Sequence, residues 1–499
     1  MSLLGLDIGT SGCKGAAYSA DGRVVATGYR EYGALHPQPG WAELDSRQVW
    51  ACIKAVIAEI SGNTGRDPIA ALSMSTMGEA MTPVSAGRDI LGNSILHTDA
   101  RGETYVQQLQ DRLGQERFYQ INPNILGCNY SLPKLKWMQE HQPELYGRAA
   151  KFLLWGDFVT FMLGCEPLTS YSQANRTLLF DIRREAWSDE ILTLMGIEKR
   201  LLPTPVASGT IAGIVDKRIA AELGLSPNTT VVVGGHDQCC NSLGSGIYEA
   251  GKAVCGIGTV ECITPTYSSI PAAAQMLKTG LNVEHHVLPN LYVSFIYNQA
   301  GSLIRWFRDT FAAGDKRLLA SDQDIYDVLA QEMPAEPTSL LALPYFEPTG
   351  TPYLITDAAG VLLGLKTSTT RGEILKALME GETFYFVESM LMLKALGIDT
   401  SEFVATGGGA KSDHWLQIKA DIFGIPFVRP KVVEAGTLGA AMLAGLATGV
   451  WRTAQEAAAC FVKAERRFEP DPGRQARYQE KYQHYQQLYP AVKQLLQAR

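Results

Sequence analysis

The stretch LLGLDIGTSG, residues 3–12, puts a single aspartate inside an apolar run and follows it with a turn of two glycines, a threonine and a serine. A charged carboxylate within a hydrophobic strand costs free energy unless a partner neutralises it. A surface hairpin would give the same letters, because Gly and Ser favour turns and Asp tolerates them. A dinucleotide-binding loop would instead need G-x-G-x-x-G, which residues 9–12 do not supply.

The residues after this turn favour a third interpretation. Residues 13–18 continue as a second extended segment, Asp21-Gly22 makes a turn, and residues 23–26 begin a third strand. This order predicts a β-meander whose first turn offers backbone N–H groups and hydroxyls. Such a turn can hold a phosphate, with a magnesium ion beside it on Asp7.

The composition is that of an ordinary soluble protein. The chain has 499 residues, of which 46% are hydrophobic and 19% charged, enough for two large cores, so we expect two domains. A formal net charge of −7 leaves no basic surface for nucleic acid. The eight histidines form no cluster with metal-ligand spacing. We therefore expect no nucleic-acid partner.

Cysteine usage and the N-terminus bear on location. Nine cysteines, an odd number without a C-x-x-C motif, favour reduced thiols in a cytoplasm. The adjacent Cys239 and Cys240 suit packing better than bridging. The N-terminus shows no basic leader or cleavage site, and no run approaches 18 uncharged apolar residues. These features predict a cytoplasmic protein without a membrane segment.

The first half alternates predicted strands and helices. Apolar residues at helical spacing predict a helix over 45–60, and a short buried strand follows over 69–74. Residues 102–195 are mostly helical in pattern, with polar loops. A strand that begins at residue 230 then runs into a glycine loop and an acid at 234–238.

The second half repeats this theme. Residues 252–259, KAVCGIGT, have the pattern of the opening stretch, an apolar strand followed by Gly-Thr. Another strand over 402–406 ends in three glycines. The chain is therefore expected to be an α/β protein of two related halves joined near 244–251, with one domain over 1–245 and the other over 246–499.

Two helices are expected near the C-terminus. One begins near residue 435, and small residues that suit close packing form one of its faces: Gly439, Ala440, Ala441, Ala444 and Gly445. From residue 470 onward, a Gln- and Tyr-rich helix is expected to dock as a tail.

Motifs spread over nearly the whole chain complete the pattern. They are GLDIGTS (5–11), TLLFD (177–181), GHDQ (235–238), GIGT (256–259), LPYF (343–346) and TGGGAKS (406–412). Together they resemble the FGGY family of carbohydrate kinases, which have the fold of actin-like ATPases, sugar kinases and Hsp70. The resemblance implies two ribonuclease H-like domains with a cleft between them. The N-terminal domain would carry the sugar site and the first phosphate loop, and the C-terminal domain the second phosphate loop and the adenosine site.

The resemblance implies ATP and Mg²⁺ as cofactors. Thr10, Ser11 and Thr259 would meet the β- and γ-phosphates, and Asp7 would hold Mg²⁺ through water, since magnesium keeps most of its hydration. Lys14 would add a cation, although a solvated strand lysine explains it equally well. The other ATP-binding residues implied by the family pattern are Gly258, Gly301, Arg305, Gly408, Gly409 and Asp413. A surface ion pair would explain Arg305 as well.

Asp237 is the catalytic residue that the resemblance implies. It would accept the proton of the sugar hydroxyl as that oxygen attacks the γ-phosphate. In the loose transition state of phosphoryl transfer the proton leaves late, so the orientation of the carboxylate matters more than its basicity. A plain helix N-cap after a strand is the alternative interpretation of this position.

The first acceptor loop departs from the family patterns. Xylulokinase-like members have Met-His-Gly there and glycerol kinase-like members have Arg-Glu, whereas this chain has Met77-Gly78-Glu79. A carboxylate that accepts hydrogen bonds from paired hydroxyls suits a neutral polyol or ketose better than an anionic sugar acid. Further substrate contacts implied by the family are Asp99, Asn129, Tyr130 and Gln238. A solvated loop glutamate at 79 and a packing role for Tyr130 are the alternatives.

Two classes of function follow. The first is an ATP-dependent kinase for a small ketose or polyol, most plausibly xylulose-like, with glycerol, gluconate, fuculose or an autoinducer-type polyol as other family substrates. The second is an ATP-switched binding or regulatory protein of the same fold, in which Asp237 would have no task. A small-molecule substrate and a homodimer are the expected partners.

Overall fold

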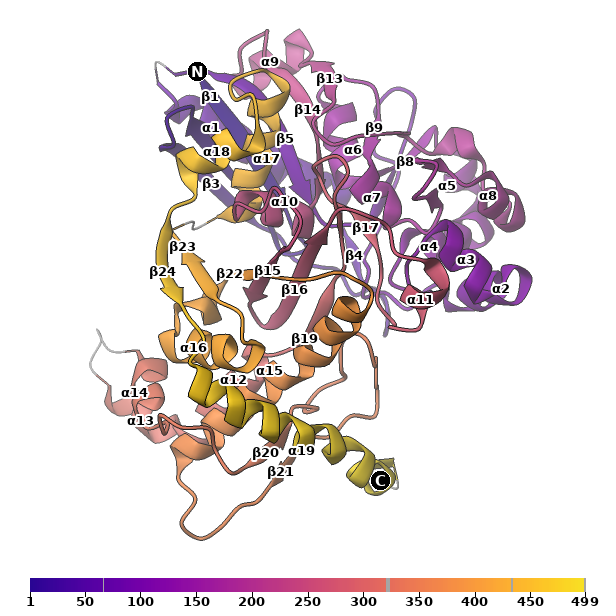
Figure 1. The fold of residues 1–499 in the computed structure, drawn as a ribbon. Helices are drawn as coiled ribbons and strands as arrows, with labels where there is room; N and C mark the ends of the chain where they lie inside the picture. Colours follow the sequence, from indigo (N-terminus) through magenta and orange to yellow (C-terminus); the bar gives the residue numbers. More distant parts are fainter. Residues whose placement is uncertain (66, 320–323, 432–433, 498–499) are drawn as a thin grey trace.

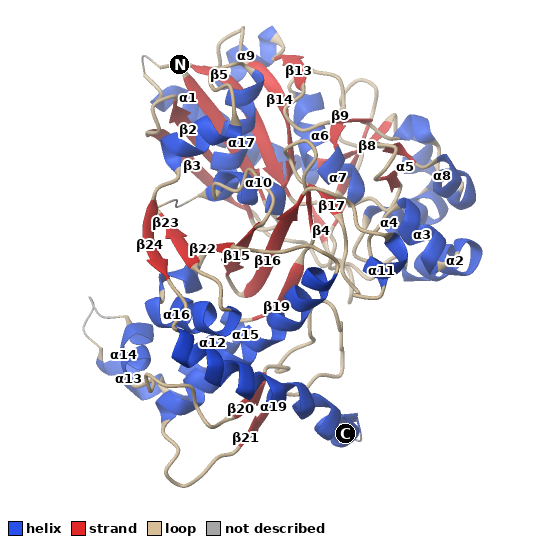
Figure 2. Cartoon of the chain, viewed as in Figure 1, coloured by secondary structure: helices blue, strands red, loops and turns tan. Residues whose placement is uncertain are grey.

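The structure is a computed structural model that describes residues 1–65, 67–319, 324–431 and 434–497. Two β-sheets, one from each half of the chain, form its framework, and helices pack against both (Figures 1 and 2). The first sheet has the strand order β13-β14-β5-β1-β2-β3. Its strands are β1 (Ser2–Ile8), β2 (Gly12–Ser19), β3 (Val24–Glu31), β5 (Ile69–Thr76), β13 (Ile211–Ile214) and β14 (Thr230–His236).

The opening stretch forms the predicted meander. Strand β1 pairs antiparallel with β2, which places Asp7 opposite Lys14, and β2 pairs antiparallel with β3. On its other edge β1 runs parallel to β5. A backbone hydrogen bond of 3.0 Å from Gly9 N to Gly12 O closes the first turn, so the chain reverses directly after Ile8, the last residue of β1.

The second sheet repeats the pairings of the first. Its order is β17-β18-β16-β15-β22-β23-β24, and β19 also pairs with β16. Strand β15 pairs antiparallel with β16 and parallel with β22, as β1 does with β2 and β5. The predicted duplication is therefore present in the topology. The strands are β15 (Lys252–Ile257), β16 (Val260–Tyr267), β17 (Glu284–His285), β18 (Tyr292–Val293), β19 (Ile296–Gln299), β22 (Glu402–Thr406), β23 (Phe427–Pro430) and β24 (Ala464–Phe468).

Helices cover both faces of the first sheet. Helix α1 (Ser46–Asn63), the helix expected over 45–60, begins after Asp45, whose side chain accepts hydrogen bonds from the first turn. It packs on the face that carries Leu6 and Gly15. Gly5 points to the opposite face, as alternation requires, and there a Cβ would stand 1.8 Å from the backbone oxygen of Thr437.

Thr437 belongs to helix α17 (Ala435–Ala447), which lies against β1, β5 and helix α10 (Asp237–Gly244) (Figure 1). The helix begins at Ala435, as the sequence predicts. Its small residues allow the close approach, since Cβ atoms at Gly439 and Gly244 would stand 1.9 Å from backbone oxygens of the other helix. The division between residues 245 and 246 thus separates the two sheets. Helix α17, however, belongs to the C-terminal part and covers one face of the first sheet.

The remaining helices fall into two groups. Those between the strands of the first sheet are α2 (Glu103–Leu113), α3 (Gln115–Ile121), α4 (Ser131–His141), α5 (Pro143–Arg148), α6 (Trp155–Met162), α7 (Tyr171–Asn175), α8 (Asp189–Met195) and α9 (Lys217–Leu223). Those of the second half are α11 (Ala273–Leu277), α12 (Gly301–Phe311), α13 (Ala313–Leu318), α14 (Ile325–Gln331), α15 (Arg371–Ala395), α16 (Asp413–Phe423), α18 (Ala454–Phe461) and α19 (Pro472–Gln497). Helix α19 is the docked tail, with Tyr478 and Tyr485 in the core of the second half.

Short strand pairs complete the fold. They are β4 (Glu43–Leu44) with β7 (Ser94–Ile95), β6 (Met81–Val84) with β8 (Lys151–Leu154), β9 (Leu168–Ser170) with β12 (Thr204–Val206), β10 (Phe180–Asp181) with β11 (Ala186–Trp187), and β20 (Leu341–Leu343) with β21 (Val361–Leu363). All nine cysteines are free thiols. Across the described ranges, none of the helices has the length and apolar character needed to cross a bilayer.

Candidate active site

Three adjoining pockets form a cleft lined by both halves of the chain. We call them the Glu79 pocket, of about 660 Å³, the Asp7 pocket, of about 410 Å³, and the Trp415 pocket, of about 510 Å³. Asp237 and Gln238 line both of the first two, and Gly258 lines both of the last two. These shared residues make the three pockets continuous.

The two glycine turns meet this cleft from different sheets. Thr10 and Ser11, between β1 and β2, line the Glu79 pocket. Gly258 and Thr259, between β15 and β16, line the Trp415 pocket. The first turn therefore meets the cleft in the Glu79 pocket and the second in the Trp415 pocket, and Gly258 of the second turn also lines the Asp7 pocket.

Asp7 lies in the middle pocket at the end of β1. Its Oδ1 accepts a hydrogen bond of 2.8 Å from Ser75 Oγ, and burial raises the pKa of its carboxyl. Gly436, at the start of α17, leaves room for it, because a Cβ there would stand 2.8 Å from Asp7 Oδ2. Lys14, opposite Asp7 on β2, pairs at 3.1 Å with the exposed Glu434, which also lines this pocket.

The middle pocket has the donors that a hydrated magnesium ion needs. Asp7 and Asp237 both line it, and Mg²⁺ in phosphoryl-transfer sites takes one or two carboxylates and fills its remaining positions with water and phosphate oxygens. Among the described residues, no group of three or more His, Cys, Asp or Glu side chains is placed to enclose a metal ion. Asp7 and Asp237 could supply the one or two carboxylates that such an ion takes.

Asp237 is the first residue of α10 and stands where the Glu79 and Asp7 pockets meet. Its Oδ1 accepts a 2.6 Å hydrogen bond from Gln238 N and lies 3.3 Å from His236 Nε2. Burial, reinforced by the negative charges of Asp7 and Glu79, raises the pKa of Asp237 to about 7. Its side chain remains 36% exposed to the cleft. The carboxylate can therefore exchange a proton near neutral pH.

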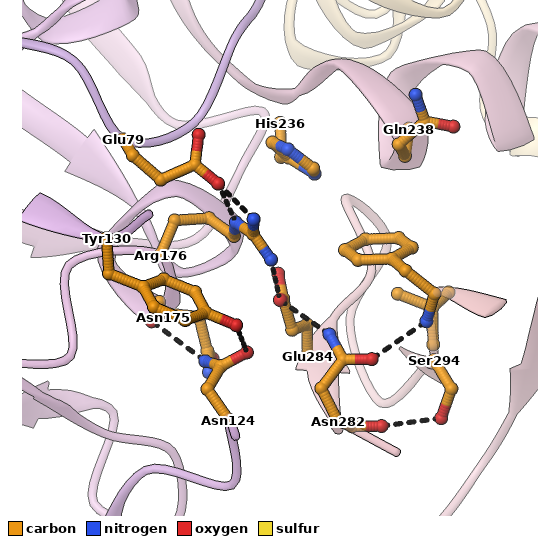
Figure 3. Close-up of polar contacts among 12 residues, drawn as sticks. Glu79, Asn124, Tyr130, Asn175, Arg176, His236, Gln238, Asn282, Glu284 and Ser294 are labelled. Carbon is orange, nitrogen blue, oxygen red and sulfur yellow. Dashed lines mark hydrogen bonds and ion pairs between the residues drawn. The ribbon is translucent and has the colours of Figure 1, made fainter. Parts of the chain in front are cut away.

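Arg176, which the sequence did not single out, lies at the centre of the Glu79 pocket (Figure 3). Its Nε and Nη2 donate to Glu79 Oε1, at 2.8 Å for Nε, and its Nη1 donates to Glu284 Oε1 at 2.6 Å. Asn282 donates to the same oxygen of Glu284 at 2.7 Å. Glu79 is thus an ion-pair partner, not a solvated loop residue.

His236 and Tyr130 complete the surroundings of this arginine. Burial and the nearby Arg176 lower the pKa of His236 to about 3, so the imidazole is neutral at physiological pH. Its buried Nδ1 has no hydrogen-bond partner within the described ranges. The ring of Tyr130 lies 4.9 Å from the Arg176 guanidinium, and its hydroxyl donates to Asn124 Oδ1.

The other expected acceptor contacts divide into two groups. Met77, Gly78, Asn129 and Gln238 line the Glu79 pocket. Asp99 does not, contrary to the expectation that it faces the sugar. It is buried, and its Oδ2 accepts hydrogen bonds from Arg101 Nη2 at 2.7 Å and from Ala42 N at 2.6 Å. Arg101, two residues later in the sequence, thus binds the carboxylate that was expected to contact the sugar.

The Trp415 pocket contains most of the residues expected around the nucleoside. They are Gly301, Arg305, Gly408 and Gly409, in addition to Gly258 and Thr259. Arg305 Nη2 lies 3.5 Å from Thr259 Oγ1. Asp413 is not part of the lining, because Arg429, at 2.8 Å, and Arg466 bind its carboxylate. Two aromatic side chains also line this pocket: Trp415, which follows the TGGGAKS motif in the sequence, and Tyr326, which no motif indicates.

Comparison with known proteins agrees with this architecture. The model of the FGGY family of carbohydrate kinases, N-terminal domain, matches residues 2–244, and the C-terminal domain model matches residues 253–448. A xylulose kinase of Bacillus subtilis is 30% identical over 498 residues, which are 99% of this chain and 97% of the relative. A glycerol kinase of Albidiferax ferrireducens is also 30% identical and covers 97% of this chain and 98% of its own.

A solved structure shows the same fold. The xylulose kinase from Rhodospirillum rubrum has a TM-score of 0.89 to this chain at 25% identity, and the similarity covers 100% of both chains. This is the fold of the actin-like ATPases and sugar kinases. With both family domains present and a continuous cleft lined by both halves, the chain is a phosphotransferase that belongs to the FGGY family of carbohydrate kinases.

Proposed function

We propose that this kinase transfers the γ-phosphoryl group of ATP to a hydroxyl of a small neutral ketose or polyol, with a xylulose-like ketose as the leading acceptor. The position of Asp237, at the junction of the Glu79 and Asp7 pockets, is the observation that carries the proposal. The full-length xylulose kinase relative supports the choice of acceptor. FGGY kinases use ATP, and the cofactor proposed beside it is Mg²⁺.

In this proposal the acceptor lies in the Glu79 pocket and the triphosphate extends from the Trp415 pocket into the Asp7 pocket. Backbone N–H groups of the two glycine turns would bind the phosphates, and Asp7 is the carboxylate that would hold a magnesium ion. Such an ion would neutralise charge on the phosphates, which is what a loose phosphoryl-transfer transition state needs most. Asp237 orients the attacking hydroxyl and accepts its proton as the new O–P bond forms.

Glu79 and Gln238 bind the acceptor. Glu79 Oε1 is occupied by Arg176, whereas Oε2 makes no hydrogen bond within the described part of the chain and is free to accept from a hydroxyl (Figure 3). Gln238 lines both pockets that flank the reacting atoms. A ligand with neighbouring hydroxyls can use both groups at once.

An acceptor screen tests this proposal. ADP release is measured with the purified protein, ATP and Mg²⁺ against pentuloses, hexuloses, polyols including glycerol, and aldonates. We expect a neutral ketose or polyol to raise ADP release well above the ATP-only rate. Stimulation by an aldonate alone would contradict the proposed acceptor class. ADP release that no compound raises above the ATP-only rate would favour an ATP-switched binding protein of the same fold.

A further inference from the structure

Glycine at position 78 creates the space that Arg176 occupies. A Cβ at Gly78 would stand 3.0 Å from Arg176 Cγ, 3.2 Å from its Nε and 3.2 Å from His236 Cδ2. Any side chain at this position would press its Cβ against both residues, which would have to shift by a few tenths of an ångström. The cation beside Glu79 therefore comes from a different element, the end of helix α7.

Arg176 supplies the positive charge of the Glu79 pocket. It is the one lysine or arginine among the described residues that line this pocket, and the lining also contains the carboxylates of Glu79 and Asp237. Glu284 lies behind it, fully buried. One guanidinium thus faces two carboxylates, Glu79 and Glu284, so the three side chains together carry a charge of −1 when all are ionised.

Glu284 is held firmly, although it comes from the second half of the chain. Asn282 donates to it, and Asn282 Oδ1 in turn accepts from Phe295 N at 2.8 Å (Figure 3). The segment around β17 is also bound to the first half. Val283 N donates to Pro123 O at 2.9 Å, and Tyr119 OH donates to Leu281 O at 2.5 Å. These contacts hold Oε1 of the carboxylate beside the arginine.

We propose that Arg176 is the specificity-determining residue of the acceptor pocket, and that Glu284, by cancelling its charge, makes the pocket select uncharged polyhydroxy acceptors over sugar acids. Arg176 keeps N–H groups that donate to hydroxyls, since only three of its five are used by the two carboxylates. A ligand carboxylate gains no net positive charge there and meets the negative charges of Glu79 and Asp237. The inference rests on the proposed function and assigns the origin of its selectivity.

Two variants test this assignment by moving selectivity in opposite directions. The measured quantity is the inhibition constant of D-xylonate, competing with D-xylulose or whichever neutral acceptor is most active, divided by the KM of that acceptor. Glu284→Gln removes a negative charge but keeps the shape, so this ratio should fall on the order of tenfold, as expected for one charge within several ångströms. Arg176→Met leaves the carboxylates unopposed, so xylonate should bind more weakly still and the KM of the neutral acceptor should rise.

Controls separate selectivity from folding. Arg176→Lys keeps the charge and should retain much of the wild-type ratio. Glu190→Gln removes the exposed carboxylate that pairs with Arg117 in the same half of the chain, and it should leave the xylonate ratio unchanged. The KM of ATP should stay within about twofold in Glu284→Gln, because the Trp415 pocket is untouched.

Each outcome bears on one claim. If the wild-type protein phosphorylates no acceptor, the proposed function fails. A second outcome is that the wild-type protein phosphorylates a neutral acceptor while Glu284→Gln, Arg176→Lys and Arg176→Met all give the same xylonate ratio. Arg176 then has a structural role only, and the inference is overturned. A wild-type preference for xylonate over neutral acceptors would also overturn it, because Arg176 would then be an anion-binding residue.

Discussion

Asp237 lies half-buried in the cleft among acidic neighbours, and this determines when it can act as a base. Burial, together with the charges of Asp7 and Glu79, raises its pKa to about 7. Only the ionised carboxylate accepts a proton, so kcat/KM for the acceptor should be low below the pKa, rise through about pH 7 and level off above it. The test is a pH profile between about pH 5.5 and 9. A profile that is flat through neutrality would contradict the role of Asp237 as base.

Ser75 controls the charge of the proposed magnesium ligand. Its hydrogen bond to Asp7 lowers a pKa that burial raises, so Ser75→Ala should favour the protonated carboxyl, which binds magnesium poorly. We expect the Mg²⁺ concentration for half-maximal activity to rise roughly fivefold to tenfold, as for the loss of a hydrogen bond to a charged group. A magnesium titration of the activity measures this.

Ser73→Ala is the matched control for Ser75→Ala. Ser73 lies on the same strand, is equally buried, and its Oγ has no hydrogen-bond partner within the described residues. The control should leave the magnesium dependence unchanged. Equal effects of the two variants would mean that packing of β5, and not the hydrogen bond to Asp7, determines the response to magnesium.

Residues that lie in the cleft because of a local motif could be placed there from the sequence, and residues held there by long-range pairs could not. The glycine turns and Asp7 could be predicted because strand, glycine and hydroxyl follow one another in the sequence. Arg176 could not, since its carboxylate partners lie 97 and 108 residues away and no local pattern indicates them. Asp99 differs, because the arginine that binds its carboxylate, Arg101, is only two residues away, and Asp99 lies outside the lining of the Glu79 pocket.

At the scale of elements, the contact between helices α10 and α17 connects the base to the metal site. Helix α10 begins with Asp237, and α17 begins beside Asp7. Gly439→Ala would place a Cβ 1.9 Å from Cys240 O. The helices would have to separate, so we expect a loss of about 1–3 kcal/mol in the free energy of unfolding and a lower kcat. Urea denaturation and steady-state kinetics measure the two effects.

Gly147→Ala is the control for the helix contact. Gly147 lies in the exposed part of α5, and a Cβ there meets open space. Because alanine is a better helix former than glycine, the free energy of unfolding of this variant should rise by up to about 1 kcal/mol, and its activity should be unchanged. A Gly439→Ala protein as stable as Gly147→Ala would show that the close approach of α10 and α17 is unimportant.

The elements that the sequence predicted are those with long apolar or amphipathic patterns. The meander, the strands that lead into glycine loops, helix α1 and the small-residue helix α17 are of this kind. The short strands that position the acceptor pocket are different. Strand β17 has only two residues, and it forms through its pairing with β18 and its contact with helix α7, which no periodicity indicates.

At the scale of the whole molecule, helices near the end of the chain cover one face of the first sheet. Helix α17 covers β1 and β5, and α18 packs on α17. A fragment of residues 1–245 would therefore expose a sheet face in which Gly5 and its neighbours offer little side-chain cover. We expect this fragment to lack cooperative unfolding and to be cleaved rapidly by protease, whereas the full chain resists. Native-like cooperative unfolding of the fragment would contradict this account.

The central claim is that one carboxylate, at the junction of two pockets, directs the γ-phosphoryl group of ATP to an acceptor hydroxyl. The most direct test is phosphorylated product formed by the wild-type protein and by Asp237→Asn with the best acceptor of the screen, alongside the binding of ATP. We predict that the variant folds and binds ATP as the wild type does and loses transfer by roughly two to four orders of magnitude. Product formation by Asp237→Asn at near wild-type rates would contradict the account.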